Sequence, residues 1–341
     1  MTTVGVAGAT GLVGRTILAI LAERAFPVDE LRVFASTRSA GSKLETAWGE
    51  VEVEDLAEAD PGGIDLALFS AGAERSRAHA GRFVERGAVV DNSSAFRMDP
   101  QVPLVVVGVN DADLDAHRGL VANPNCTTIA LVMAAAPLHR RAGLRKVVAS
   151  SYQSVSGSGQ RGIAELRRQV TALGADYEAL AAGGWKDPGS EVYARPIGWN
   201  VIPFAGTEAE GGYTDEEWKL VGETRKILGL PGLALEATCV RVPVAVGHAV
   251  SASLWFEQPV TSEGAAGVLR DSPGVELWEE GIPTPLDAAG RDEVLVGRLR
   301  ETLGEPGGIN LWVVSDNLRK GAALNAVQIG EQLLELGQIG D

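Results

Sequence analysis

Short apolar runs alternate with helical stretches through the first third of the chain. Apolar runs of four to six residues occupy positions 4–8, 31–35, 65–70, 88–91 and 104–107. Between them, segments such as 13–25 and 74–86 carry apolar residues at helical spacing. Strands that are apolar on both faces and alternate with helices are typical of a parallel sheet built from βαβ units. We therefore expect an α/β domain with a parallel sheet over about residues 1–122.

The pattern changes after residue 122. It predicts long helices over 127–142 and 161–182, separated and followed by extended stretches at 147–153, 240–256, 293–300 and 308–314. Longer strands with fewer helices between them indicate a mixed sheet of the α+β type. The last segment, 320–336, carries a strong apolar helical stripe, but periodicity alone does not identify the surface on which this helix packs.

Composition and charge narrow the class of protein. The chain has 341 residues, 45% of them hydrophobic, and a formal net charge of −15 from 30 basic and 45 acidic residues. Such an acidic protein lacks the basic surface of a nucleic-acid binder or of a protein that binds anionic membranes. An anionic substrate would have to be held by local Arg and Lys side chains.

The cysteines and the apolar runs indicate a cytoplasmic protein. Two cysteines, Cys126 and Cys239, make neither a disulfide framework nor a zinc site, and we expect no bound metal. The sequence starts without a basic region, so no signal peptide is expected. No apolar run reaches the roughly 18 residues of a membrane span.

A glycine-rich loop follows the first predicted strand and opens the first predicted helix. Residues Gly8–Gly14 have the spacing G-x-x-G-x-x-G. Such a loop allows a tight turn, a close backbone approach to a pyrophosphate, and helix N–H groups directed at it. We expect a dinucleotide site here; the alternative is a turn whose glycines serve packing alone.

The end of the second predicted strand favours NADP over NAD. An NAD site normally offers Asp or Glu to the ribose hydroxyls at this point. The segment 34–39 has no carboxylate, whereas Arg38, with Ser36 and Ser39, would suit a 2′-phosphate. The alternative is a solvated Arg in a polar loop.

Cys126 occupies a position suited to a nucleophile. The turn Asn123–Asn125 contains a proline and precedes an apolar helix, so Cys126 is expected near the helix N-terminus. The helix dipole and free N–H groups there lower the pKa of a thiol and stabilise a developing oxyanion. A small buried apolar role remains the alternative for Cys126, and it is the expected role of Cys239 within a strand.

Among the four histidines, His248 is the candidate acid or base. It follows Gly247 at the end of an extended run, where its ring would face a cleft. His79, His117 and His139 lie among polar residues and are expected at the surface. A structural role for His248 stays open at this point.

Seven motifs together resemble one family, the aspartate-β-semialdehyde dehydrogenases. They lie in the family's order between residues 4 and 335, and they are Gly8–Gly14, Asn92–Met98, Asn123–Thr127, Ser151–Gly157, Glu216–Lys219, Arg241–His248 and Trp312–Ala322. The resemblance implies a Rossmann-type domain at 1–124, with 318–341 returning to it, and a catalytic and dimerisation domain at 125–317. It also implies reductive dephosphorylation of L-aspartyl-β-phosphate by NADPH to the semialdehyde and phosphate.

The resemblance also implies a role for each matching residue. Cys126 matches the nucleophile that forms an acyl-thioester, His248 the acid/base, and Gln153 a residue that orients the intermediate. The implied substrate-binding residues are Arg241 for the carboxylate, Glu216 for the amine, Arg97 and Lys219 for phosphate, and Asn125. The implied cofactor-binding residues are Gly8, Thr10, Gly11, Leu12, Val13, Arg38, Ser39, Ser156, Gly157 and Asn317.

Three other functions compete with this interpretation. A reductase of N-acetyl-glutamyl phosphate would share the glycine loop, the Cys and the His, but a free α-amine favours a carboxylate partner such as Glu216. A non-catalytic nucleotide-binding paralogue would be expected to lack the thiol or the imidazole. A plain aldehyde dehydrogenase would not need the Arg97/Lys219 pair. The resemblance further implies a homodimer or homotetramer, and the segment 183–212 is the least family-like part of the chain.

Overall fold

The structure, a computed structural model, describes residues 1–340. Its contacts divide the chain into two compact units. The first contains residues 1–132, 223–231 and those from 318 onward, and the second contains 133–222 and 232–317. The predicted functional boundary at residues 124/125 stays a prediction. Within residues 1–340, no helix has the length and apolar character needed to cross a bilayer.

The first unit is built on a largely parallel sheet, as the apolar runs predict. Its strand order is β3-β4-β2-β1-β5-β6-β7, with only β3 antiparallel to its neighbour. The strands are β1 (Thr3–Ala7), β2 (Glu30–Ala35), β3 (Lys43–Thr46), β4 (Gly49–Asp55), β5 (Leu66–Phe69), β6 (Ala88–Asp91) and β7 (Leu120–Ala122).

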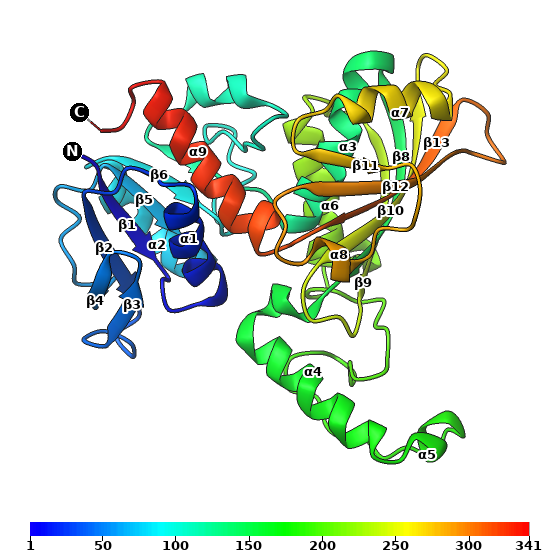
Figure 1. Ribbon diagram of the computed structural model, residues 1–341, viewed down its shortest axis with the longest axis horizontal. Coiled ribbons are helices and arrows are strands. Elements are labelled where there is room, and N and C mark those ends of the chain that lie inside the picture. The colour runs from blue at the N-terminus through cyan, green and yellow to red at the C-terminus, as the bar shows by residue number, and fades with distance from the viewer. Residues whose placement is uncertain (341) are drawn as a thin grey trace. The chain divides into compact units, whose positions relative to one another are not determined.

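Helices cover both faces of this sheet. Helix α1 (Leu12–Glu23) and helix α9 (Leu324–Glu335) pack on the face that carries Val4 and Leu68. They lie beside each other in Figure 1, in blue and red. Helix α2 (Ala73–Val84) packs on the opposite face, where Phe83 lies edge-to-face against Phe34. The C-terminal helix therefore returns to the first domain, as the resemblance implies.

One predicted strand of the first unit is not formed. In the run 104–107 only Leu104 makes an isolated bridge, to Ala122. The N–H groups of Val106 and Val107 donate instead to the side-chain oxygens of Asn110 and Asn325, at 2.9 and 3.0 Å. These side-chain acceptors replace the neighbouring strand that the apolar pattern alone predicts.

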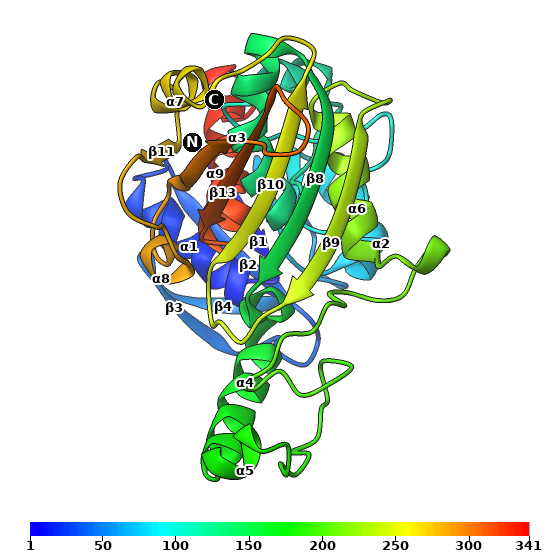
Figure 2. The ribbon, with the colours of Figure 1, turned by 90° about the vertical axis from the view of Figure 1, so that its right-hand side faces the viewer.

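The second unit is built on a mixed sheet, which confirms the predicted α+β type. Its strand order is β11-β12-β13-β10-β8-β9, with parallel pairs only at its two ends. Figure 2 shows β8, β9, β10 and β13 beside one another. The strands are β8 (Leu144–Gln153), β9 (Ala234–Arg241), β10 (His248–Phe256), β11 (Val275–Trp278), β12 (Val294–Glu301) and β13 (Gly308–Ser315).

Alternate residues of β8 show that one face of this sheet is buried and the other is more exposed. Val147 and Ala149 are buried, whereas Val148 between them is 43% exposed. The remaining helices are α3 (Cys126–Ala142), α4 (Gly159–Gly174), α5 (Tyr177–Ala181), α6 (Asp215–Ile227), α7 (Ser262–Arg270) and α8 (Pro285–Ala288). Helices α3 and α6 each contribute residues to both units.

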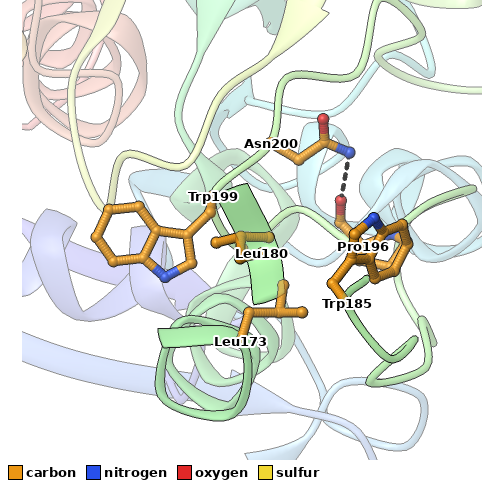
Figure 3. A pocket seen from close by; sticks show the side chains of 7 residues that line it. Leu173, Leu180, Trp185, Pro196, Trp199 and Asn200 are labelled. Carbon is orange, nitrogen blue, oxygen red and sulfur yellow. Dashed lines mark hydrogen bonds between the residues drawn. The ribbon is translucent and has the colours of Figure 1, made fainter. Parts of the chain in front are cut away.

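The predicted single helix over 161–182 is two helices. Asp176 leaves the helical conformation and its side chain accepts a bond from the Ala179 N–H, so it caps the short helix α5. The chain after α5 folds back, and Trp185 and Trp199 line a pocket of about 140 Å³ with Leu173 and Leu180 (Figure 3).

Gly14 in the first turn of α1 allows a close backbone contact that no other residue permits. A Cβ at this position would lie 2.2 Å from the Gly8 carbonyl oxygen. We expect Gly14→Ala to lower the free energy of unfolding by about 1–3 kcal/mol, measured by urea denaturation.

The matched control is Gly81→Ala in helix α2, where a Cβ meets nothing within 4 Å. It should raise the free energy of unfolding by about 0.5–1 kcal/mol, because Ala favours a helix interior. Equal effects of the two substitutions would contradict this account of Gly14.

Candidate active site

The glycine loop between β1 and α1 has the backbone geometry of an anion cradle. Gly8 adopts a φ of +84°, and a Cβ there would lie 2.2 Å from the Ser70 carbonyl oxygen. Gly11 precedes α1 without a side-chain cap, and the first turn carries no acidic residue. The N–H groups of that turn thus have no side-chain acceptor within the loop. Thr10, Leu12 and Val13 are partly exposed. These residues fit a dinucleotide pyrophosphate.

The loop after β2 offers a cation and no carboxylate. The Ser39 N–H donates to the Ser36 carbonyl at 2.7 Å and closes a turn. Arg38 in this turn is exposed, and its guanidinium forms no hydrogen bond or ion pair with residues 1–340. The guanidinium is therefore available for an external anion.

Cys126 is the first residue of helix α3, as predicted, and its side chain is partly exposed. Neither of the two cysteines forms a disulfide. The Asn125 side-chain oxygen accepts the Thr127 N–H at 2.9 Å, and the Asn125 carbonyl accepts the Ile129 N–H at 2.9 Å. Asn125 therefore caps α3, and its side-chain oxygen is occupied in this capping contact.

A buried ion pair lies directly against this turn. Arg97, predicted to bind phosphate, is only 8% exposed. Its guanidinium donates to the Asn123 carbonyl (2.9 Å), the Asn92 carbonyl (2.7 Å) and the Glu223 carboxylate (3.0 Å). These contacts use three of the five N–H groups of the guanidinium, so two remain for a ligand.

Glu223 was not among the residues selected from the sequence. Its second carboxylate oxygen accepts the Asn125 N–H at 2.6 Å. Glu223 follows Glu216 by seven residues and Lys219 by four, which places all three on one face of α6. The helical spacing of Glu223 from Glu216 and Lys219 is the sequence pattern that indicates Glu223 as a further site residue.

His248 in the second unit is buried in a neutral form. Its Nδ1 lies 3.0 Å from the Ser154 backbone nitrogen, which can only donate. Nδ1 therefore accepts, and the proton of the neutral ring lies on Nε2. Burial, followed by the positive charge of Arg241, lowers the pKa of His248 to about 3.

Two glycines shape the space around this ring. Gly247 has a φ of +96°, and a Cβ there would lie 2.9 Å from Pro285. A Cβ at Gly157 would lie 3.3 Å from His248 Nε2 and 3.2 Å from an Arg241 terminal nitrogen. A side chain at position 157 would therefore crowd the Nε2 side of the ring.

Ser156 and Asn317, both predicted to bind cofactor, lie beside this histidine. The Asn317 side-chain oxygen lies 3.0 Å from Ser154 Oγ and 3.1 Å from Ser156 Oγ, and it accepts the Gly247 N–H at 2.9 Å. Both side chains are buried. Their contacts support the turn that carries His248.

Gln153, Glu216 and Lys219 form a connected polar set in the second unit. The Gln153 amide donates to one Glu216 oxygen at 3.0 Å, and the Lys219 amine donates to the other at 2.8 Å. Lys219 also pairs with Asp215 at 2.6 Å. Burial works against the charged amine, but the two carboxylates outweigh it, so the pKa of Lys219 lies above its usual value.

Arg241 at the end of β9 is 6% exposed. One terminal nitrogen donates to the Ser154 carbonyl at 2.8 Å, and the buried Nε has no hydrogen-bond partner among residues 1–340. Its guanidinium carbon lies 5.6 Å from the centre of the Tyr193 ring. Tyr193, in the segment 183–212, was not selected from the sequence, because nothing near it in the chain indicates this contact.

The predicted site residues fall into two clusters, each described within its own unit. The first unit holds the glycine loop, Arg38, Ser39, Arg97, Asn125 and Cys126; the second holds Gln153, Ser156, Gly157, Glu216, Lys219, Arg241, His248 and Asn317. No group of three or more potential metal-ligating side chains occurs in the described part of the chain.

Family comparisons define the class of protein. A family model described as the semialdehyde dehydrogenase NAD binding domain matches residues 3–117, and one described as the semialdehyde dehydrogenase dimerisation domain matches residues 135–320. Together with the Rossmann-type sheet and the glycine loop, these matches define a nicotinamide-dependent oxidoreductase of the semialdehyde dehydrogenase class.

The chain belongs to the aspartate-semialdehyde dehydrogenase family. It is 52% identical to the enzyme of that name from Streptomyces akiyoshiensis, covering 96% of this chain and 97% of the relative. It is 45% identical to that of Aquifex aeolicus, covering 98% and 99%. The crystal structure of aspartate semialdehyde dehydrogenase II complexed with ASA from Vibrio cholerae matches with a TM-score of 0.92 and 41% identity, covering 98% of both chains.

The neutral, buried state of His248 predicts a pH-dependent stability. The unfolded chain protonates this ring below about pH 6.5, whereas the folded chain does so only near pH 3. The stabilisation is therefore complete above pH 6.5 and is lost as the pH falls toward 3. The loss is up to about 1.4 kcal/mol per pH unit.

We expect the free energy of unfolding to fall less steeply over this range in His248→Gln than in wild type, in urea titrations at several pH values. His79→Gln, at a partly exposed position of α2, is the matched control and should keep the wild-type slope. Identical slopes for wild type and His248→Gln would contradict the neutral buried state.

Proposed function

We propose that this chain catalyses the NADPH-dependent reductive dephosphorylation of L-aspartyl-β-phosphate to L-aspartate-β-semialdehyde and phosphate. The observation that carries the proposal is Cys126 as first residue of α3, after a turn held by buried polar groups. A partly exposed thiol at a helix N-terminus is suited to act as a nucleophile. The family to which the chain belongs supports the same reaction.

The reaction begins at the thiol of Cys126. Its thiolate attacks the acyl carbon, the bond from that carbon to the phosphate oxygen breaks, and inorganic phosphate leaves. The result is an acyl-thioester on Cys126. A nicotinamide dinucleotide held at the glycine loop would supply the hydride for reduction of the acyl carbon. The carbon–sulfur bond then breaks, the aldehyde leaves, and Cys126 returns to the thiolate.

His248 acts in this scheme through the proton on Nε2. Since Nδ1 accepts the Ser154 N–H, Nε2 is the nitrogen that donates. A neutral donor suits the oxygen on the acyl carbon, where negative charge develops during thiolate attack and hydride transfer. This geometry favours hydrogen-bond donation to that oxygen over withdrawal of the thiol proton, which would need a free ring nitrogen.

The polar groups of both clusters suit the rest of the substrate. A guanidinium fork such as that of Arg241 binds a carboxylate, and the unused Nε of Arg241 supports this assignment. Glu216 suits the α-amine, and Gln153, hydrogen-bonded to Glu216, orients the acyl group. Arg97 and Lys219 bring two positive charges for the phosphate of the substrate.

NADP is the dinucleotide that the first unit favours. Arg38 is exposed and unpaired within residues 1–340, and Ser39 shares its turn. Together they suit a 2′-phosphate, and the segment 34–39 itself has no carboxylate that would bind the ribose hydroxyls of NAD.

We further propose that the protein is a cytoplasmic homodimer or homotetramer. The match to a dimerisation domain over residues 135–320 supports self-association. The mixed sheet supports it too, because one face leaves Val148 43% exposed and Tyr152 and Trp312 only half-buried. Two thiols outside any disulfide are compatible with a reducing compartment.

Absorbance at the NADPH band tests the reaction. The protein is mixed with aspartate-β-semialdehyde, NADP and phosphate, and each component is then omitted in turn. We expect NADPH to form only when all three are present, and much more slowly with NAD in place of NADP. Oxidation that proceeds without phosphate would contradict the proposal, as would activity with N-acetyl-glutamate semialdehyde alone.

Replacing the nucleophile gives a second prediction. Cys126→Ala should abolish NADPH formation while NADPH binding, measured by fluorescence titration, is retained. Cys239→Ala is the matched control and should keep activity, because burial raises the pKa of the Cys239 thiol to about 12 and leaves it unreactive. Turnover by Cys126→Ala would refute the thioester.

A further inference from the structure

Glu223 is a buried carboxylate with both oxygens engaged on separate groups. Its side chain is 1% exposed. One oxygen pairs with an Arg97 terminal nitrogen at 3.0 Å, and the other accepts the Asn125 N–H at 2.6 Å. A buried carboxylate needs such charged and N–H partners to offset the loss of hydration.

Each partner of Glu223 has a place in the proposed reaction: Asn125 precedes the nucleophile Cys126, and Arg97 is proposed to bind phosphate. The Asn125 N–H belongs to the residue that precedes Cys126 and caps its helix. The Arg97 guanidinium also binds the Asn123 and Asn92 carbonyls, so it is anchored in the same turn. Glu223 thus joins the backbone that carries the nucleophile to the cation that is proposed to bind phosphate.

The other charges near Glu223 belong to a lysine and its acidic neighbours. Lys226, three residues later on α6, donates to the carbonyls of Arg97, Asp99 and Val102 at 2.7–2.8 Å. Burial lowers the pKa of Lys226, and Asp99, Asp113 and Glu223 partly offset this effect. Lys226 therefore holds the loop that follows Arg97, while Glu223 contacts both Arg97 and the Asn125 N–H.

We infer that Glu223 is a positioning residue for the reaction: its carboxylate orients the Arg97 guanidinium toward phosphate and holds the Asn125–Cys126 turn. The inference rests on the proposed function for the phosphate role of Arg97. Because Glu223 is negative and next to the turn, it also balances Arg97 and limits how strongly that cation favours the Cys126 thiolate.

The variant Glu223→Gln separates the positioning role of Glu223 from a simple loss of folding. It should make Cys126 more reactive while it weakens the binding of phosphate. Loss of the negative charge leaves the positive charge of Arg97 uncompensated. Iodoacetamide should therefore alkylate Cys126 faster in the variant than in wild type when the two are compared at lower pH. The extent of alkylation is measured by mass spectrometry of the peptide that contains Cys126. At the same time the KM for phosphate in NADPH formation should rise on the order of tenfold, because Arg97 loses its orientation. A variant that is merely less folded would not give faster thiol alkylation with weaker phosphate binding.

Two further variants complete the test. Glu223→Asp keeps the charge but shortens the side chain, so its alkylation profile should stay near that of wild type while the KM for phosphate still rises. The matched control is Glu217→Gln on the same helix. Glu217 is a buried carboxylate that accepts the Thr214 and Cys239 N–H groups and touches neither Arg97 nor Asn125. We expect Glu217→Gln to leave both measurements unchanged.

Unchanged alkylation and unchanged phosphate KM in Glu223→Gln would overturn the inference, as would equal changes in Glu217→Gln. Alkylation needs no substrate, so it tests Glu223 even if wild-type protein makes no NADPH from the semialdehyde. If the wild-type protein makes no NADPH, the proposed function is refuted. The role of Glu223 in positioning the Cys126 turn is then decided by the alkylation measurement alone.

Discussion

The start of helix α3 is the constraint on which the first unit's chemistry depends. Residues 127–138 of this helix are buried, so the polar groups of its first turn cannot be left to water. Asn125 caps the helix, and Glu223 accepts the Asn125 N–H. The same contacts leave the Cys126 side chain partly exposed. The hydrogen bonds of Asn125 therefore do two things: they cap a buried helix, and they hold the turn that presents the nucleophile.

Internal pairing explains how a protein with a net charge of −15 presents cations to an anionic substrate. Arg97 is held by Glu223, and Lys219 by Asp215 and Glu216, all acidic residues of α6. Removing either partner of the buried Arg97–Glu223 pair leaves an unbalanced charge and costs far more than an exposed pair is worth. Within each unit, acidic residues of helix α6 thus hold one of these cations in a fixed orientation before any ligand binds.

Much of the fold was predictable because its signals are local. Apolar runs located most strands of both sheets, and helical spacing located α1, α2, α3 and α9. The errors arose where polar side chains accepted backbone N–H groups and replaced the expected conformation. The run 104–107 was expected to be a strand, but the amides of Asn110 and Asn325 accept its N–H groups. The stretch 161–182 was expected to be one helix, but Asp176 ends its regular conformation and caps α5.

The chain order of residues is enough to indicate the family, the glycine loop, the thiol at a helix start and the histidine after Gly247, because each depends on neighbours in sequence. Three features were decided only by folding: the tautomer of His248, the ion pair of Glu223 with Arg97, and the contact of Tyr193 with Arg241. Each joins residues between 48 and 126 positions apart in the chain. No local pattern encodes such a contact, since it exists only when packing brings the two segments together and removes water from between them.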